Sequence, residues 1–147
     1  MVKLDIFTHT SPVESIGFRF WQTFIKWQRQ IDIVLAPLDL TQPSFSILAL
    51  IGWQLQQNIS ISSQHVRQKV IVDMSGMPKM QVSLILQRLK KSKLITISPY
   101  PLDLREQQVQ LTDEGLAVLR KAITLVEEVD NKTLSQENLV RLIETNE

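Results

Sequence analysis

The stretch Asp103-Leu104-Arg105-Glu106-Gln107-Gln108-Val109-Gln110-Leu111-Thr112-Asp113-Glu114-Gly115 decides the fold that this sequence predicts. It reads as a charged loop tip, then a short β-strand, then the start of a capped helix. A second alternating segment lies just upstream, over residues 94–98, and a basic helix over residues 80–93 precedes it. Helix, strand, charged loop and strand in this order are typical of a winged helix, so the region predicts binding to nucleic acid.

The composition sets broad limits on the rest of the chain. The chain has 147 residues, 44% of them hydrophobic, which predicts one domain, residues 1–147, with a packed core. It has no cysteine, which excludes disulfides and thiolate metal sites. No apolar run approaches the ~20 residues of a membrane span, and residues 1–5 lack the apolar region of a secretory signal. We therefore expect a cytoplasmic protein with no membrane contact.

Charge is unevenly distributed, although the net charge is only +1. Residues 60–110 contain eight basic and three acidic residues, whereas residues 111–147 contain four basic and eight acidic ones. A basic middle beside an acidic end predicts that the middle meets a polyanion. The alternative is an ordinary basic face exposed to solvent.

Two helices are expected ahead of the basic region. The first begins near Ser11 and Pro12, carries apolar residues at helical spacing and ends at Pro37. Its aromatic area exceeds the needs of a small core, which predicts a partner surface; the alternative is a purely intrachain core. Thr41 caps the second helix. The predicted buried face of this helix consists of Phe45, Leu48, Ala49 and either Gly52 or Trp53.

A helix-turn-helix is predicted between residues 62 and 93, after a possible short strand over residues 59–61. Ser62 or Ser63 caps its first helix, which reaches about Met74, and Gly76 permits positive φ in the turn. The first helix buries Val66, Val70 and Ile71, and the second buries Val82, Ile85, Leu86 and Leu89.

Two more helices are expected after the wing. Thr112 caps the first of them, and Thr133 or Ser135 caps the last. Their predicted apolar stripes are Leu116, Leu119, Ile123 and Val126 in the first, and Leu139, Leu142 and Ile143 in the last.

From about residue 11 to residue 144 the chain resembles the multiple antibiotic resistance regulator (MarR) family of winged-helix transcription factors. The most specific match is Asp103-x-Arg105, followed after a strand by Leu111-Thr112-x-x-Gly115, with residues 38–41 and the pair Val82-Ser83 in support. The resemblance implies a mainly α fold with a small β wing. Residues 59–111 would form the winged helix-turn-helix lobe, and residues 11–58 with 112–147 a helical dimerisation lobe. It further implies a homodimer on a palindromic DNA site.

Two residues depart from the family pattern. Lys93 stands where the family commonly has a glycine that ends the recognition helix, so another C-cap is expected there. Leu84 stands where relatives often carry a polar or basic residue on the recognition helix, which bears on base reading rather than on docking.

Arg105 is the expected minor-groove contact at the wing tip, oriented by Asp103. Glu106 is a competing partner, and an exposed mobile ion pair is the alternative reading. An ordinary amphipathic surface helix is likewise the alternative for residues 80–93, and simple capping for Ser62 and Ser63. The predicted DNA contacts are Ser62, Ser63, Gln64, Arg67, Lys79, Gln81, Ser83, Gln87, Arg88, Lys91, Asp103 and Arg105.

An effector site is implied by the resemblance, for a small aromatic or phenolic acid. The residues that could line it are Phe18, Trp21, Phe45 and Trp53, and a filled core is the alternative. His9 and His65 are far apart in sequence, so neither a metal nor another cofactor is predicted. No nucleophile, base and oxyanion site can be assembled, so an enzyme is not predicted. The leading hypothesis is a sequence-specific repressor; the alternative is a winged-helix protein-interaction module that does not bind DNA.

Overall fold

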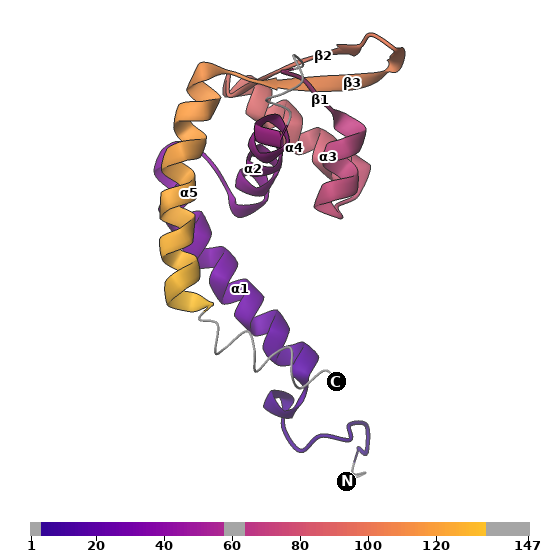
Figure 1. Cartoon of the computed structure of the whole chain (residues 1–147). Helices are drawn as coiled ribbons and strands as arrows, with labels where there is room; N and C mark the ends of the chain where they lie inside the picture. Colours follow the sequence, from indigo (N-terminus) through magenta and orange to yellow (C-terminus); the bar gives the residue numbers. More distant parts are fainter. Residues whose placement is uncertain (1–3, 58–63, 135–147) are drawn as a thin grey trace.

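The computed structural model describes residues 4–57 and 64–134, which form mainly helices and a small sheet (Figure 1). The predicted strand over residues 59–61 and the predicted last helix lie outside the described residues. In chain order the elements are η1 (Pro12–Glu14), α1 (Ile16–Leu35), η2 (Ala36–Leu38), α2 (Gln42–Gln57), β1 (Val66–Arg67), α3 (Gln68–Ser75), α4 (Lys79–Lys91), β2 (Ile95–Tyr100), β3 (Asp103–Leu111) and α5 (Asp113–Thr133). The predicted mainly α fold with a small β wing is confirmed.

The described strands form one antiparallel sheet in the order β1-β3-β2. Val109 of β3 is fully buried and pairs with Val66 on one side and Ile97 on the other. The β2–β3 hairpin turns at residues 101–102 and extends past α3 as the wing (Figure 1). The sheet therefore anchors the base of the wing in the core and leaves its tip in solvent.

The predicted start of the third helix is wrong. Residues 64 and 65 are not helical, Val66 and Arg67 form β1, and α3 begins at Gln68. The physical reason is tertiary: Val66 is buried against the sheet, and its extended backbone pairs with Val109. His65 therefore lies ahead of β1 and not on the surface of α3.

The helix-turn-helix is otherwise as predicted. Gly76 ends α3 in the left-handed region at φ 70°, and the amide of Met77 donates to Ser75 Oγ at 3.0 Å. The predicted inner face of α4 is confirmed by four buried side chains, Val82, Ile85, Leu86 and Leu89. This burial fixes which residues of α4 remain available on its outer sides.

The first helix starts later than predicted. Ser11 caps only the short η1, and Ser15 caps α1 by accepting a hydrogen bond from the amide of Phe18 at 3.3 Å. Of the apolar stripe, only Ile31 and Leu35 are buried. The aromatic half of α1 is thus largely exposed in the single chain, as a partner surface requires.

The second helix begins as predicted, because Thr41 Oγ1 accepts from the amide of Ser44 and Thr41 donates its own amide to Ser44 Oγ at 2.8 Å. Of the two alternatives for its inner face, Gly52 faces Leu119, whereas Trp53 is exposed. Its fully buried residues include two that the sequence prediction omitted, Ile47 and Ile51.

The apolar stripe of α5 is shifted from the predicted one. Leu119 and Val126 are buried as expected, but Leu116 and Ile123 are exposed. The inner face consists of Gly115, Leu119, Ala122, Val126 and Val129. α5 packs against α1, and the indole Nε1 of Trp27 donates to Asp130 Oδ1 at 2.7 Å across that contact.

Thr112 and Gly115 join α5 to the end of α4. The Thr112 hydroxyl accepts from the Gly115 amide at 2.9 Å, and the Thr112 amide donates to the Leu94 carbonyl at 3.0 Å. A Cβ on Gly115 would lie 2.0 Å from the Leu94 carbonyl oxygen, so only glycine fits. The family-like Leu-Thr-x-x-Gly motif is therefore a close-packed junction between two elements.

Lys93 follows Ser92, the C-cap of α4, and adopts the left-handed conformation at φ 65°. Its amide donates to the Lys90 carbonyl at 2.9 Å, and the amide of Leu94 donates to the Leu89 carbonyl at 3.0 Å. This is the Schellman arrangement that usually contains glycine. The backbone at this position therefore has the conformation typical of glycine, and this conformation is strained for lysine because of its Cβ.

We predict that Lys93→Gly raises the free energy of unfolding by about 0.5–1 kcal/mol, because glycine adopts positive φ without the clash of a Cβ. Lys90→Gly is the matched control: it removes the same side chain inside α4 and should lower stability by about 1 kcal/mol. Urea titration followed by circular dichroism measures both. A lower urea midpoint for Lys93→Gly would contradict the prediction.

Among the described residues, no single helix is both long enough and apolar enough to cross a membrane. The segment Ile16–Leu38 and α2 would satisfy length and composition only as a pair, with a 72° bend between them.

Candidate nucleic-acid interface

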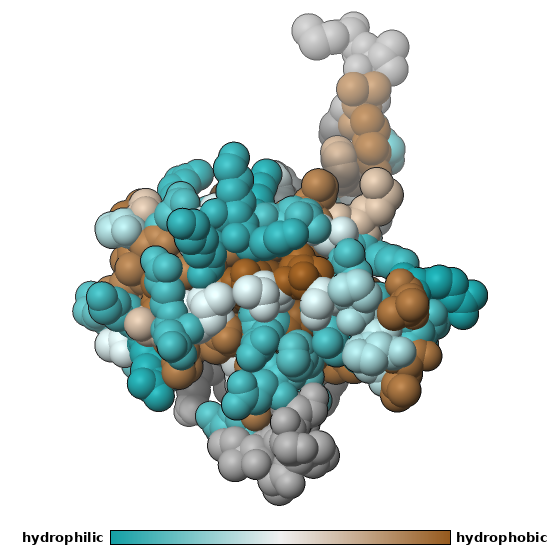
Figure 2. Space-filling model, turned by 90° about the horizontal axis from the view of Figure 1, so that it is seen from above, coloured by the Kyte–Doolittle hydropathy of each residue, from teal (hydrophilic) through white to brown (hydrophobic). Residues whose placement is uncertain are grey.

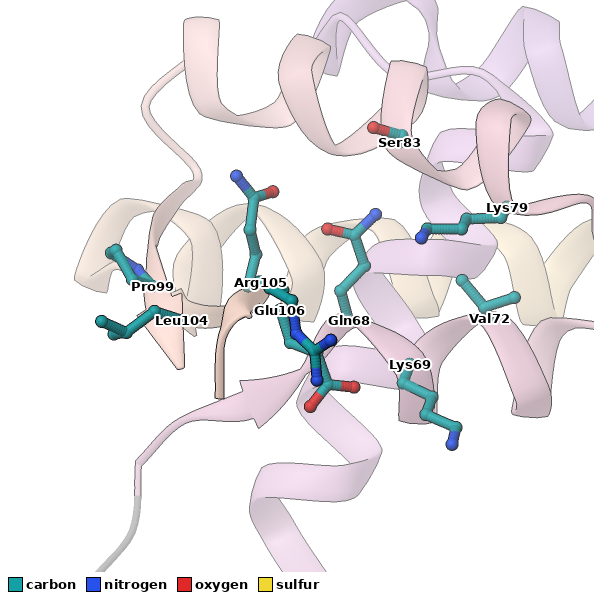
Figure 3. A pocket seen from close by; sticks show the side chains of 10 residues that line it. Gln68, Lys69, Val72, Lys79, Ser83, Pro99, Leu104, Arg105 and Glu106 are labelled. Carbon is teal, nitrogen blue, oxygen red and sulfur yellow. The ribbon is translucent and has the colours of Figure 1, made fainter. Parts of the chain in front are cut away.

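A hollow of about 500 Å³ lies between α3, α4 and the wing (Figure 3). From α4 it receives two of the predicted DNA contacts, Lys79 and Ser83, and from the wing a third, Arg105. Arg105 is more than twenty positions from Lys79 and Ser83 in sequence, and it lies near them because β3 folds back over α3. The fold therefore brings a cation of the recognition helix and the wing arginine to one concave face.

Arg105 is an exposed charged group of that face, with 91% of its side chain accessible. Its Nε donates to Asp103 Oδ1 at 3.0 Å and its Nη2 to Asp103 Oδ2 at 3.2 Å, so the pair is bidentate. The Arg105 amide donates to the same carboxylate at 3.1 Å. The hydrogen bond from the Arg105 side chain is the main cause that lowers the pKa of Asp103, which keeps the carboxylate ionised and the guanidinium held.

Glu106 does not compete for Arg105. It pairs with Nη2 of Arg67, which is also the first cause that raises the pKa of Arg67. The Arg67 guanidinium carbon lies 4.5 Å from the ring centroid of Tyr100, and its Nε is buried without a hydrogen-bond partner among the described residues. Arg67 therefore joins β1 to both wing strands, and its positive charge is already paired with the carboxylate of Glu106.

The other predicted contacts on α4 do not all face this hollow. Gln87 is exposed on α4, and Gln81 lines a different hollow beside α2. Arg88 and Lys91 line a third one, near the C-terminal end of α4. Lys79 and Ser83 are thus the predicted α4 residues that share a face with the wing.

Of the predicted contacts ahead of α3, Ser62 and Ser63 lie outside the described residues. Gln64 is exposed, and its Oε1 accepts from Gln110 Nε2 at 3.3 Å, next to the sheet. The sequence prediction missed Gln68 and Lys69 of α3, which line the hollow. The sequence prediction started α3 at Ser62 or Ser63 and so did not place Gln68 and Lys69 in its first turn. With the correct start at Gln68, both residues would have been candidates.

In the view of Figure 2, hydrophilic residues gather on either side of a central band of intermediate and apolar residues. Apolar residues gather at the outer end of the wing, at the right of that view, where Leu102 and Leu104 are exposed. On α4, Met80 and Leu84 are exposed as well. The wing and α4 therefore expose apolar side chains as well as cations and polar groups.

The residues predicted to line an effector site are divided between two places. Phe45 and Trp53 line the hollow beside α2, together with Phe24 of α1. Phe18 and Trp21 do not line it; their rings contact each other on α1 with centroids 5.9 Å apart. Among the described residues, no group of three or more His, Cys, Asp or Glu could hold a metal ion.

Comparison with known proteins defines the class. No family model matches the sequence. The uncharacterized HTH-type transcriptional regulator YdcH of Bacillus subtilis (strain 168) is 31% identical over 121 residues, which cover 82% of this chain and 79% of that protein. This identity and coverage show that the chain belongs to the HTH-type transcriptional regulators.

Solved structures define the fold within that class. A MarR-family transcriptional regulator from Rhodococcus sp. RHA1 superposes with a TM-score of 0.74 at 18% identity, covering 94% of this chain and 93% of the other. Bordetella bronchiseptica BpsR, whose DNA binding is regulated by 6-hydroxynicotinic acid, superposes with a TM-score of 0.75 at 20% identity, covering 93% and 94%. The chain has the winged helix-turn-helix fold of these regulators.

The contacts of Arg67 are compatible with two roles, positioning the wing or binding phosphate, and one substitution separates them. If Arg67 positions the wing, Glu106→Gln should weaken binding to duplex DNA at low salt, because the wing loses its tie to β1. If Arg67 binds phosphate, the same substitution should strengthen binding, because it removes a negative charge and frees the guanidinium.

We expect weaker binding, measured by fluorescence anisotropy of a labelled duplex, with circular dichroism as a check on folding. Glu127→Gln is the matched control, since it removes one exposed carboxylate on α5, away from the wing and from the predicted contacts of α4. Tighter binding by Glu106→Gln alone would contradict the positioning role of Arg67.

Proposed function

We propose that this chain binds operator DNA in a sequence-specific way and acts as a transcriptional repressor in the cytoplasm. The observation that carries the proposal is the shared concave face, on which Lys79 and Ser83 of α4 lie opposite Arg105 of the wing (Figure 3). α4 would lie in a major groove, and the wing arginine would enter the neighbouring minor groove, where negative potential is concentrated.

The wing arginine suits this task for an electrostatic reason. Its guanidinium is exposed, yet Asp103 restricts its orientation through two hydrogen bonds. A preoriented cation loses less conformational entropy on binding than a free side chain. Lys69 and Lys79, both exposed on neighbouring helices, supply further positive charge for phosphates.

Arg105→Ala should weaken operator binding by ~1–3 kcal/mol and reduce the slope of log affinity against log salt by about 0.9. The operator is first obtained by selecting bound sequences from a random DNA pool. Lys132→Ala is the matched control, because it also removes one exposed cation but lies in the last turn of α5, far from the wing. An unchanged affinity and slope for Arg105→Ala would remove the arginine from the proposed interface.

We further propose that the protein acts as a homodimer held by the helical lobe. Phe20, Trp21, Phe24 and Ile25 expose apolar surface on the N-terminal half of α1, which extends beyond the last turn of α5 (Figure 1). So much exposed aromatic area on one helix is typical of an interface. A two-fold dimer would place two α4 helices on successive major grooves, about 34–36 Å apart, and would select an inverted repeat.

Trp21→Glu should convert the dimer into monomers in analytical ultracentrifugation, because it places a charge in an apolar interface. Leu102→Glu is the matched control: it introduces the same charge at an exposed leucine, at the wing tip. Wild-type protein that sediments as a monomer, or a Trp21→Glu variant that still dimerises with wild-type affinity, would refute this interface.

A second candidate function follows from exposed Met80 and Leu84 on α4. Apolar side chains on a recognition helix favour a protein-interaction module that does not bind DNA. The two functions are separated by the salt series: a module of this kind would show no salt-sensitive DNA binding and would capture a stoichiometric protein partner.

We also propose that a small aromatic effector releases the operator. The support is the hollow beside α2, which borders both α1 and the start of α4 and contains Phe45 and Trp53. An effector there would contact the helical lobe and the recognition helix together.

A further inference from the structure

The hollow beside α2, referred to below as the α2 cavity, is separate from the face that carries Arg105. It has a volume of about 620 Å³, within the usual range for a small-molecule site. Its walls come from α1, α2, the end of α3 with the following turn, and the first turn of α4. A ligand in it would therefore contact every helix that positions the recognition helix except α5.

The apolar part of the wall is aromatic and thioether in character. Phe24, Phe45 and Trp53 contribute rings, and Met74 and Met77 contribute flexible sulfur-containing side chains. Phe24 and Trp53 remain 38% and 53% exposed, so this apolar surface is only partly covered by the chain itself. Rings and thioethers at these positions suit a flat aromatic ligand.

The polar part of the wall is made of amides and hydroxyls. Gln28 Nε2 donates to Gln42 Oε1 at 3.2 Å, and Gln42 Nε2 donates to Ser46 Oγ at 2.9 Å. This chain of hydrogen bonds orients the Ser46 oxygen as an acceptor, and within the described residues its own hydrogen meets no acceptor. Ser46 can therefore donate one hydrogen bond to a ligand oxygen.

None of the described residues that line the α2 cavity carries a charge. A carboxylate placed there would lose hydration without gaining a cationic partner, which is unfavourable in an apolar setting. A neutral hydroxyl or carbonyl loses much less and can pair with Ser46 or with a glutamine amide. The charge balance of the wall therefore selects against aromatic acids, the class that resemblance to the family implies.

We propose that the α2 cavity binds an uncharged aromatic molecule bearing a hydroxyl or carbonyl group, and that aromatic carboxylates are excluded from it. The proposal rests on the proposed function in one respect, namely that the occupant regulates DNA binding. Met77 and Gln81 provide the connection: both line the α2 cavity, and Gln81 is two residues from Lys79, which lines the wing face. An occupant that favours one position of α4 must alter the affinity for DNA.

The test compares two probes of matched shape, 2-naphthol, which is neutral at pH 7, and 2-naphthoate, which is anionic. Isothermal titration calorimetry of the full chain should show that the naphthol binds at least about tenfold more tightly, because only the carboxylate must be desolvated without a partner. Equal binding of the two probes, tighter binding of the carboxylate, or no binding of either overturns the proposal.

Ser46→Lys should reverse the preference by placing a cation in the α2 cavity. Gln28→Lys serves the same purpose from α1 if Ser46→Lys fails to fold, as judged by circular dichroism. Thr124→Lys is the matched control, since it adds the same charge at an exposed position of α5 that does not line the α2 cavity, and it should leave the naphthol preference intact. A folded Ser46→Lys or Gln28→Lys variant that still prefers the naphthol would contradict the assignment of the site.

DNA binding is measured separately, without and then with saturating 2-naphthol. Loss of all DNA binding in the absence of probe would refute the proposed function while leaving the calorimetric result valid. Probe binding with no change in DNA affinity would show that the cavity is not regulatory.

Discussion

The junction of Thr112 and Gly115 with the end of α4 is the contact on which the rest of the structure depends. The Thr112 side chain caps α5, and the Thr112 amide donates a hydrogen bond to the Leu94 carbonyl. Gly115 lies so close to that carbonyl that no larger residue fits. The first turn of α5 is therefore fixed relative to the exit of α4. Because α5 also packs on α1, this junction and the packing of α2 on α3 and α4 together relate the helical lobe to the helix-turn-helix.

The wing is built outward from the same place. Ile95, the first residue of β2, pairs with Leu111, the last of β3, directly beside Thr112. Farther out, the Arg67 guanidinium contacts Glu106 of β3 and the ring of Tyr100 in β2. These contacts hold the hairpin at its base and along its length. They therefore determine where the wing places the exposed Arg105.

Sequence alone predicted the parts whose signals are local. Thr112 as a cap, Gly76 in the turn and the inner face of α4 depend on a few neighbouring residues, and all were confirmed. The start of α3 depends on strand pairing between Val66 and Val109, which are distant in the chain, so helical spacing misplaced it.

The same contrast between local signals and contacts of distant residues applies to the candidate sites. The bidentate pair of Asp103 and Arg105 spans two residues and could be predicted from the motif. The partner of Arg67 could not be predicted, because Glu106 is on another strand. The prediction of Arg67 as a DNA contact left out that ion pair. Phe18 and Trp21 were grouped with Phe45 and Trp53 on aromatic character, yet they lie on a part of α1 that the α2 cavity does not reach.

α4 has three distinct sides within thirteen residues, which constrains how the proposed effector would act on the proposed DNA-binding face. Its inner face is buried, Lys79 and Ser83 border the wing face, and Gln81 borders the α2 cavity. A hydrogen-bonded helix moves as a unit, so a ligand that shifts Gln81 also shifts Lys79 and Ser83. The two sites then share one rigid element whose position both can bias, and coupling between them requires no longer chain of contacts through the core.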